Sequence, residues 1–307
     1  MTDALAFLAR RAPLFLALGV FAGLFLPDIA TAARTLLEPG VVALMTVSLL
    51  RLDWSALGRS LRPPAAALVA ALWLLVLTPL LAWSLALALG LSPSLTTALV
   101  LNGAAPALIA AIPIAQLVGL DAPLVVTLVV VTTLALPVTL MPVLLWLLGL
   151  AGALDLGAFL LRFALYIVAP FAVAGTLRAW LGGARIEART VSLDGANVVL
   201  LVLCALGLMD GVTAEVLARP GKMLGFLIAA VVFNAGLQAL GALAFRGRGR
   251  LAALTVGLVL GNRNMALMLV LMAGVVGPDF GLYVAMAQLP IYLLPALGTP
   301  IYRRLGV

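Results

Sequence analysis

Titratable side chains are scarce in this sequence. It contains no histidine, a single cysteine and only 9% charged residues among 307 positions. One thiol excludes an intramolecular disulfide and a cysteine-based metal cage. The absence of histidine removes the usual zinc ligand and the side chain that most readily titrates near neutral pH. The sequence therefore predicts no catalytic residues, no metal site and no cofactor.

Apolar residues make up 65% of the chain, and its mean hydropathy is +1.28. A soluble domain of this length needs more charge on its surface. The sequence predicts an all-α polytopic membrane protein whose partner is the lipid bilayer. We expect ten transmembrane helices, most of them near the ~20 residues that a spanning helix requires, at 12–29, 37–50, 65–89, 94–118, 122–149, 157–180, 192–209, 222–244, 252–275 and 281–301.

Basic residues are distributed unevenly between the two sides. With ten spans, thirteen of the 18 lie on the side of both termini and four on the other, and Arg263 lies in mid-span. Positively charged loops stay in the cytoplasm, which predicts cytoplasmic termini in a bacterial inner membrane. The net charge of +7 does not indicate nucleic acid, because the basic residues occupy short loops. Residues 1–32 also resemble a signal peptide, but the apolar run 12–29 is longer than a usual signal core.

The two halves of the chain share a pattern of proline and glycine. The matching pairs lie 153 to 156 residues apart: Pro137 and Pro290, Pro142 and Pro295, Pro64 and Pro220, Gly40 and Gly195. Each half has five spans, an odd number, so the second half must cross the membrane in the opposite orientation. This predicts one five-helix repeat at 1–150 and an inverted one at 151–307. Inverted repeats with interrupted helices are typical of secondary transporters. Chance remains an alternative, because proline is frequent in spanning helices.

The ninth segment carries a charged residue in its middle. Within 254–273 the sequence reads Gly261-Asn262-Arg263-Asn264, and an arginine at the centre of a spanning helix costs about 2.5–3.5 kcal/mol on insertion scales. Gly261 permits the backbone to open, and the asparagine side chains can satisfy backbone groups that an unwound helix frees. This pattern predicts a broken helix with a binding site at Asn262, Arg263 and Asn264.

The fourth segment is the expected partner of the ninth. An offset of 153 residues maps Arg263 onto Ala110, and Asn102 and Pro106 lie in the middle of this segment. Proline inside a helix removes a hydrogen bond and clashes with the preceding turn. Two breaks brought together expose half-helix ends that favour anions. We therefore add Asn102, Pro106 and Ile109 to the predicted substrate site, although Asn102 alternatively only caps its helix.

Five other polar residues are candidates for lining a path: Thr132, Thr133, Gln116, Asn234 and Gln288. Each such residue alone more often links helices, a contact worth ~0.6 kcal/mol.

Three stretches carry a resemblance to a known family. The segment 45–54, the Thr-rich segment 129–137 and Gly261–Asn264 resemble motifs of the bile acid:sodium symporter family and its bacterial organic-anion relatives. The resemblance implies ten helices in two inverted repeats, broken crossing helices four and nine, and panel and core subdomains drawn from both repeats. It also implies transport of an organic anion.

The departures from the family pattern concern its sodium ligands. In an ungapped alignment the positions that correspond to these ligands carry Ala111, Ile112, Val125, Val129, Val259 and Arg263. A hard cation needs oxygen ligands, so the resemblance implies that both sodium sites are lost. We hypothesise that the fixed charge of Arg263 takes the place of a sodium ion.

The sequence leaves two groups as candidates to pair with the Arg263 guanidinium. No Asp or Glu lies in mid-span, and arginine cannot be deprotonated in proteins. Intramembrane charges pair with each other or with backbone carbonyls. An anionic substrate or the carbonyls of the other half-helix would each satisfy Arg263. Asn264 matches the asparagine of the family motif and is expected to contact substrate.

These features predict a sodium-independent carrier of a small organic anion that works by alternating access. Proton coupling usually needs an intramembrane carboxylate or histidine, which favours facilitated diffusion or exchange. The alternatives are a sodium-coupled symporter with a cation site rebuilt from backbone carbonyls, Asn102, Thr132 or Thr133, and a non-transporting membrane protein of the same fold. An arsenite-type exporter would need a cysteine in the fourth helix, and the one cysteine, Cys204, lies elsewhere.

Overall fold

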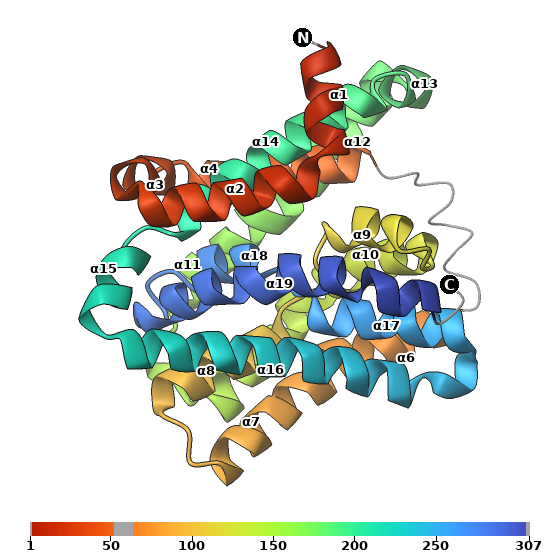
Figure 1. Ribbon diagram of the computed structural model, residues 1–307. Coiled ribbons are helices and arrows are strands. Elements are labelled where there is room, and N and C mark those ends of the chain that lie inside the picture. Colours follow the sequence, from red (N-terminus) through yellow and green to blue (C-terminus); the bar gives the residue numbers. More distant parts are fainter. Residues whose placement is uncertain (1, 52–63, 305–307) are drawn as a thin grey trace. The chain divides into compact units, whose positions relative to one another are not determined.

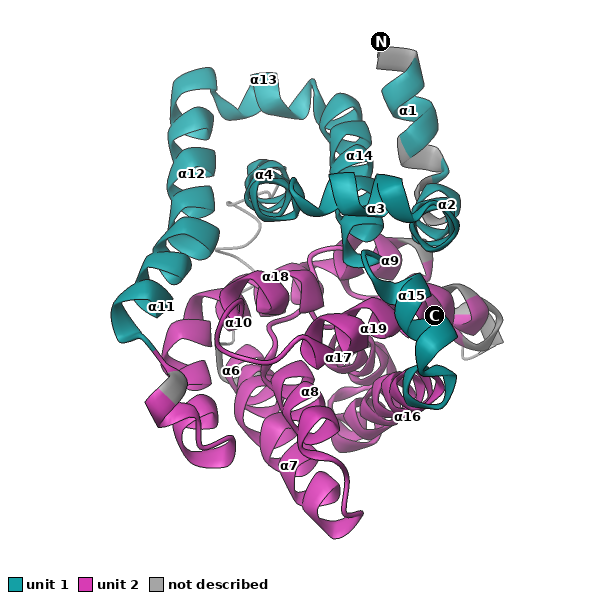
Figure 2. Ribbon diagram, turned by 90° about the vertical axis from the view of Figure 1, so that its left-hand side faces the viewer, with its two compact units in different colours: residues 1–52, 155–223 teal, residues 53–154, 224–307 magenta. Residues whose placement is uncertain are grey.

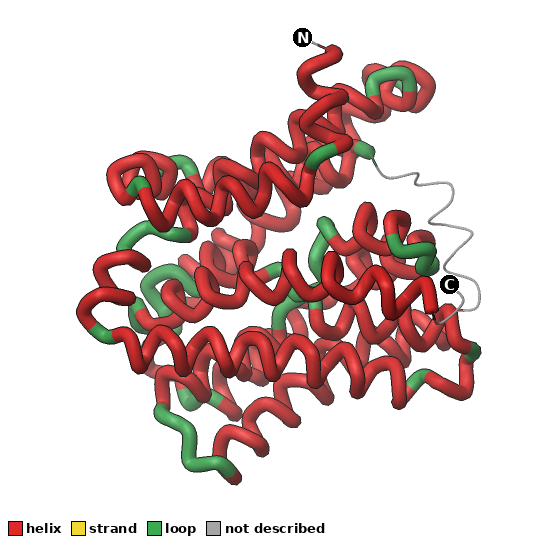
Figure 3. Tube along the Cα trace, viewed as in Figure 1, coloured by secondary structure: helices red, strands yellow, loops and turns green. Residues whose placement is uncertain are grey.

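The computed structural model describes residues 2–51 and 64–304 (Figure 1). Helices are the regular elements of this part, joined by short loops (Figure 3). Residues 52–54 of the segment 45–54, and Arg59 and Arg62 among the thirteen basic residues, lie outside the described residues. The chain forms two compact units, residues 1–52 with 155–223 and residues 53–154 with 224–307 (Figure 2). Each unit thus takes helices from both halves of the sequence.

Unit 1 is built around α14 (Thr190–Leu208), which packs against the first four helices of the chain. Those four helices are α1 (Thr2–Arg10), α2 (Ala12–Phe25), α3 (Pro27–Arg34) and α4 (Leu37–Leu50). The second half of the sequence adds α11 (Leu156–Phe163), the π turn η4 (Ala164–Val168), α12 (Ala169–Leu181), α13 (Gly183–Glu187) and α15 (Val212–Ala218).

The first predicted span, 12–29, ends earlier than expected. Helix α2 stops at Phe25, and the chain turns by 109° into α3. Pro27 has no N–H to continue α2, and a residue before proline avoids the helical region. Leu26 accordingly lies at φ −124° and ψ 72°.

Three carboxylates of unit 1 are engaged by neighbours. Glu38 accepts a hydrogen bond from the Tyr166 hydroxyl at 2.6 Å, and Asp210 accepts one from Thr31 at 2.7 Å. Asp194 forms an ion pair with Arg51. All of these contacts lie within unit 1, so these carboxylates serve its own packing.

Unit 2 holds both helices that the sequence predicts to be broken. Its first-half elements are α6 (Pro64–Leu72), the π turn η1 (Trp73–Leu77), α7 (Thr78–Ala88), α8 (Pro93–Ala104), α9 (Ala111–Leu117), α10 (Ala122–Pro142), the π turn η2 (Val143–Leu147) and the short 3₁₀ helix η3 (Leu150–Ala153). Its second-half elements are α16 (Pro220–Ala244, in unit 2 from Leu224), the 3₁₀ turn η5 (Arg246–Arg248), α17 (Arg250–Gly261), α18 (Met265–Leu271) and α19 (Asp279–Arg304).

Helices lie within all ten predicted segments, with ends that differ by a few residues, and ten membrane spans stay a prediction. Among the described residues, five helical stretches are long and apolar enough to cross a membrane: 67–88, 122–147, 156–181, 190–218 and 220–244. The bent pair α2 and α3 makes six if it counts as one span, while α4 and α17 are shorter apolar helices. Length and composition therefore identify an integral membrane protein.

Glycine lets α16 and α17 approach until their backbones touch. A Cβ atom added to Gly257 would lie 2.6 Å from the Gln238 carbonyl oxygen, and one on Gly241 would lie 2.8 Å from the Gly257 Cα. Small residues at four-residue spacing allow such contact between membrane helices. Gly261 continues the same face of α17, where an added Cβ atom would overlap Gln238 Cγ.

Candidate functional site

Both predicted helix breaks are present in unit 2. Helix α8 ends at Ala104 and α9 begins at Ala111, while α17 ends at Gly261 and α18 begins at Met265. Pro106 explains the first break, because it lacks an N–H and favours an extended residue before it. Ala105 is indeed extended, with ψ 147°.

The two breaks pair with each other through an antiparallel bridge between Ala107 and Arg263. The Leu108 N–H donates to the Asn262 carbonyl at 3.0 Å, and the Asn264 N–H donates to the Pro106 carbonyl at 2.9 Å. The bridge joins Arg263 to Ala107, whereas the offset of 153 residues maps Arg263 onto Ala110. The first break is three residues longer than the second, so a constant sequence offset does not hold across it.

The Arg263 side chain is fully buried and donates hydrogen bonds to four protein oxygens. Its Nε donates to the Leu260 carbonyl at 2.7 Å. One Nη donates to the carbonyls of Leu74 at 3.2 Å and Ala105 at 2.9 Å, and the other donates to the Thr78 hydroxyl at 3.1 Å. We call these four acceptors the oxygen cage. The geometry favours the carbonyl partner of Arg263 over the substrate partner.

Helix ends and a proline supply the carbonyls of the oxygen cage. The Thr78 N–H donates to the Trp73 carbonyl in a π turn, and residue 79 is a proline without an N–H, so the Leu74 carbonyl has no helical donor. Leu260 lies in the last turn of α17, where carbonyls lack partners within the helix. Ala105 directly follows α8. A guanidinium, with five N–H donors, satisfies several such groups at once.

Leu74 and Thr78 were not among the sequence-predicted site residues. The dipeptide Thr78-Pro79 in the middle of the third segment was the available signal, because it marks a helix with a freed carbonyl. The structure adds support at the same place: a Cβ atom on Gly103 would lie 3.0 Å from the Pro79 backbone. The third segment thus packs directly against the fourth.

We expect Thr78→Val to lower the free energy of unfolding by about 1–2 kcal/mol, because it leaves one Arg263 nitrogen without its acceptor. The measurement is thermal unfolding of the purified protein in detergent. Thr46→Val is the matched control, since in the described contacts the Thr46 hydroxyl donates to the Val42 carbonyl of its own helix alone. Equal stability of the two variants would contradict a role for Thr78 in holding Arg263.

The predicted asparagines serve local structure in different ways. Asn264 caps α18, with its Oδ1 accepting from the Leu267 N–H at 3.2 Å. Asn262 donates to the Leu258 carbonyl at 2.7 Å, and its buried Oδ1 has no partner in the described contacts. Asn102 donates to the Tyr283 hydroxyl at 2.8 Å, on α19. Asn264 and Asn262 belong to the paired breaks, whereas Asn102 forms its hydrogen bond with a residue outside them.

Within the two breaks, Ile109 alone is not buried in the described residues. Pro106, Asn262 and Arg263 are buried, and Asn264 is 8% exposed. Of the predicted substrate residues, Ile109 is therefore the most accessible.

Two of the five predicted path-lining residues hold the breaks. The Thr132 hydroxyl accepts from the Ala107 N–H at 3.0 Å, and Asn234 donates to the Gly261 carbonyl at 2.7 Å. Thr133 is buried with no hydrogen-bond partner for its hydroxyl in the described contacts. Gln288 donates to the Val284 carbonyl of its own helix, and Gln116 is exposed on α9.

Five of the six positions aligned with sodium ligands offer apolar side chains. Ala111, Val125, Val129 and Val259 are all buried, and Ile112 is half-buried. None of these side chains carries an oxygen for a hard cation.

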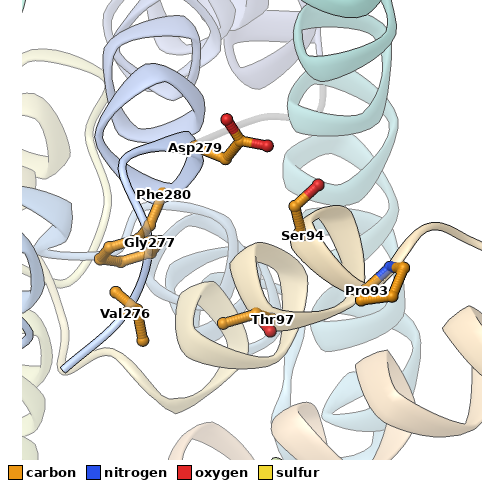
Figure 4. Close-up of a pocket in the computed structure, with 7 residues that line it drawn as sticks. All are labelled: Pro93, Ser94, Thr97, Val276, Gly277, Asp279 and Phe280. Atoms are coloured by element: carbon orange, nitrogen blue, oxygen red, sulfur yellow. The ribbon is translucent and has the colours of Figure 1, made fainter.

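A separate cavity of about 190 Å³ lies at the N-terminal ends of α8 and α19 (Figure 4). None of its lining residues was predicted from the sequence. Pro93, Ser94 and Thr97 line it from α8, and Val276, Gly277, Asp279 and Phe280 from the start of α19 and the preceding loop. It is at the opposite end of α8 from the break.

Comparison with known proteins identifies the family. The model of the sodium bile acid symporter family matches residues 38–220, which is more than half of the chain. A comparison with curated proteins finds no match. The matched stretch contains the first break and the third segment, and it ends before Arg263. The chain therefore belongs to the sodium bile acid symporter family, whose members are membrane transporters of the bile acid and organic-anion type.

Proposed function

We propose that this protein carries a small or amphipathic organic anion across the membrane without sodium, by alternating access. Family membership supports the organic-anion class. The observation that carries sodium independence is the oxygen cage around the Arg263 guanidinium.

Carbonyl and hydroxyl oxygens are the ligands that hard cations take in proteins. In this chain four such oxygens surround a positive charge that is covalently attached. Arginine cannot lose its proton here and cannot dissociate from the protein. Arg263 then stabilises the paired breaks permanently, whereas a bound ion would do so only while the ion is present. Transport on this proposal is facilitated diffusion or exchange.

We place the substrate near Asn264 and Ile109 rather than on the Arg263 nitrogens, which already donate to protein oxygens. The charge of Arg263 still favours an anion nearby, because a buried charge is weakly screened. Ile109 offers an apolar contact for the body of an amphipathic anion. We take units 1 and 2 as the panel and core subdomains, each drawn from both inverted repeats, with cytoplasmic termini in a bacterial inner membrane.

The first test compares unfolding temperatures in NaCl, KCl and choline chloride at equal ionic strength. A ligand that binds only the folded state adds RT ln(1 + [L]/Kd), about 2.7 kcal/mol at a hundredfold excess over Kd. We expect three superimposable curves. A rise specific to sodium would overturn sodium independence. Uptake of labelled organic anions into proteoliposomes, with and without a sodium gradient, then tests transport, and no uptake of any anion would favour a non-transporting protein.

One observation supports the sodium-coupled alternative. Asn262 Oδ1 and the Thr133 hydroxyl are buried oxygens without partners in the described contacts, so they are available to a rebuilt cation site. Asn102 and Thr132, two other candidate ligands, are engaged by Tyr283 and Ala107. If sodium does raise the unfolding temperature, Thr133→Val should abolish the rise on this alternative.

A further inference from the structure

Three polar side chains form a continuous hydrogen-bonded chain that ends at the second break. The Tyr302 hydroxyl on α19 donates to Gln238 Oε1 at 3.3 Å. Gln238 Nε2 donates to Asn234 Oδ1 at 2.7 Å, and Asn234 Nδ2 donates to the Gly261 carbonyl at 2.7 Å. We call these three residues the amide chain. Its members come from α16 and α19, and its last acceptor is the final residue of α17.

Glycine on α17 makes room for the amide chain. A Cβ atom on Gly261 would overlap Gln238 Cγ, and it would lie 2.8 Å from the Asn234 carbonyl oxygen and 3.0 Å from Asn234 Oδ1. No larger residue fits at this position without displacing α16. The close approach lets a short asparagine side chain reach a backbone carbonyl on the neighbouring helix.

The Gly261 carbonyl needs this donor. It is one of the last carbonyls of α17, for which the helix has no N–H, and an unsatisfied carbonyl inside a membrane protein is costly. Each amide of the chain accepts a hydrogen bond at its oxygen and donates one at its nitrogen. The hydrogen bonds therefore all run in one direction, from Tyr302 to the Gly261 carbonyl. Gly261 directly precedes Asn262 and Arg263.

We propose that Asn234, Gln238 and Tyr302 are positioning residues. They hold the last turn of α17 so that the 262–264 segment pairs with the first break and Arg263 reaches the oxygen cage. Asn234 was expected to line a path, and Tyr302 adds the C-terminal turns of α19 to the site. The inference does not depend on which anion or ion the protein binds.

The test measures hydrogen exchange of the two bridging amides, Leu108 and Asn264, in the full-length protein. Gln238→Leu breaks the amide chain in its middle. We expect both amides to exchange about tenfold faster, the factor that corresponds to roughly one net hydrogen bond. Gln288→Leu is the matched control, because Gln288 donates only within α19 in the described contacts. It should leave both amides unchanged.

Tyr302→Phe keeps the aromatic ring and removes only the outer hydroxyl, so it preserves folding if Gln238→Leu does not. We expect the same two amides to exchange about threefold faster, since the Tyr302 bond is longer and weaker. Ala107, whose N–H donates to Thr132, serves as the internal reference. Unchanged exchange at Leu108 and Asn264, or an equal increase at Ala107 and at both bridging amides, would overturn the proposal.

Discussion

Replacing Arg263 by alanine is expected to lower the free energy of unfolding by about 3–5 kcal/mol, because it strands several buried acceptors at once. The carbonyls of Leu74, Ala105 and Leu260 and the Thr78 hydroxyl all lose their donor. For a chain of this size, a fall of about 10 °C in unfolding temperature corresponds to such a loss. Thermal unfolding in detergent measures it directly.

The same variant also tests whether the cage accepts a cation. Arg263→Ala leaves the four oxygens and an empty volume, so millimolar methylguanidinium or sodium should raise its unfolding temperature while leaving the wild type unchanged. Arg250→Ala removes an exposed arginine from the start of α17 and should change stability by less than about 0.5 kcal/mol. If Arg263→Ala folds with unchanged stability and loses only anion binding, the arginine is a substrate ligand and the cage interpretation is wrong.

Gly257→Leu is expected to be the most damaging substitution in the packing of unit 2. The added Cβ would meet the Gln238 carbonyl at 2.6 Å and the Ala242 nitrogen at 3.2 Å, both of them backbone atoms. Backbone cannot rotate away as a side chain can, so α16 and α17 must separate. We expect a loss of more than about 3 kcal/mol, seen as a large fall in the yield of monodisperse protein and in its unfolding temperature.

Gly236→Ala is the control for that experiment. It lies on α16, and nothing lies within 4 Å of its added Cβ. Alanine is favoured over glycine in a helix interior by about 1 kcal/mol, so this variant should be as stable as the wild type or slightly more stable. A Gly257→Leu protein that matched it would show that the contact between α16 and α17 does not limit stability.

The sequence predicted features that depend on local chemistry. Composition indicated the helical membrane class, and the missing N–H of Pro106 together with the Gly261–Asn264 motif located both breaks. The bend at Pro27 could have been predicted from the same rule, but the apolar run continued past it and concealed the helix end.

Contacts across the chain were less accessible from sequence. The hydrogen bonds of Arg263 to Leu74 and Thr78 join residues 189 and 185 positions apart. The π turn that orients these two acceptors cannot be read from composition. Asn102 looked equivalent to the other polar residues of the breaks, yet its partner is Tyr283 on α19. A proline pattern fixes where a helix opens, whereas the identity of the group that fills the opening depends on tertiary packing.

A permanent charge inside unit 2 also has an electrical consequence. Moving one elementary charge across the whole membrane changes the electrostatic free energy by about 2.3 kcal/mol per 100 mV of membrane potential. A displacement of Arg263 along the membrane normal changes this free energy in proportion to the fraction of the potential that it crosses. Under the proposed cycle a monovalent anion beside Arg263 cancels its charge, so voltage biases the empty carrier and leaves the loaded one nearly neutral. On the proposed function, a covalently attached cation thus exchanges dependence on a sodium gradient for sensitivity to membrane voltage.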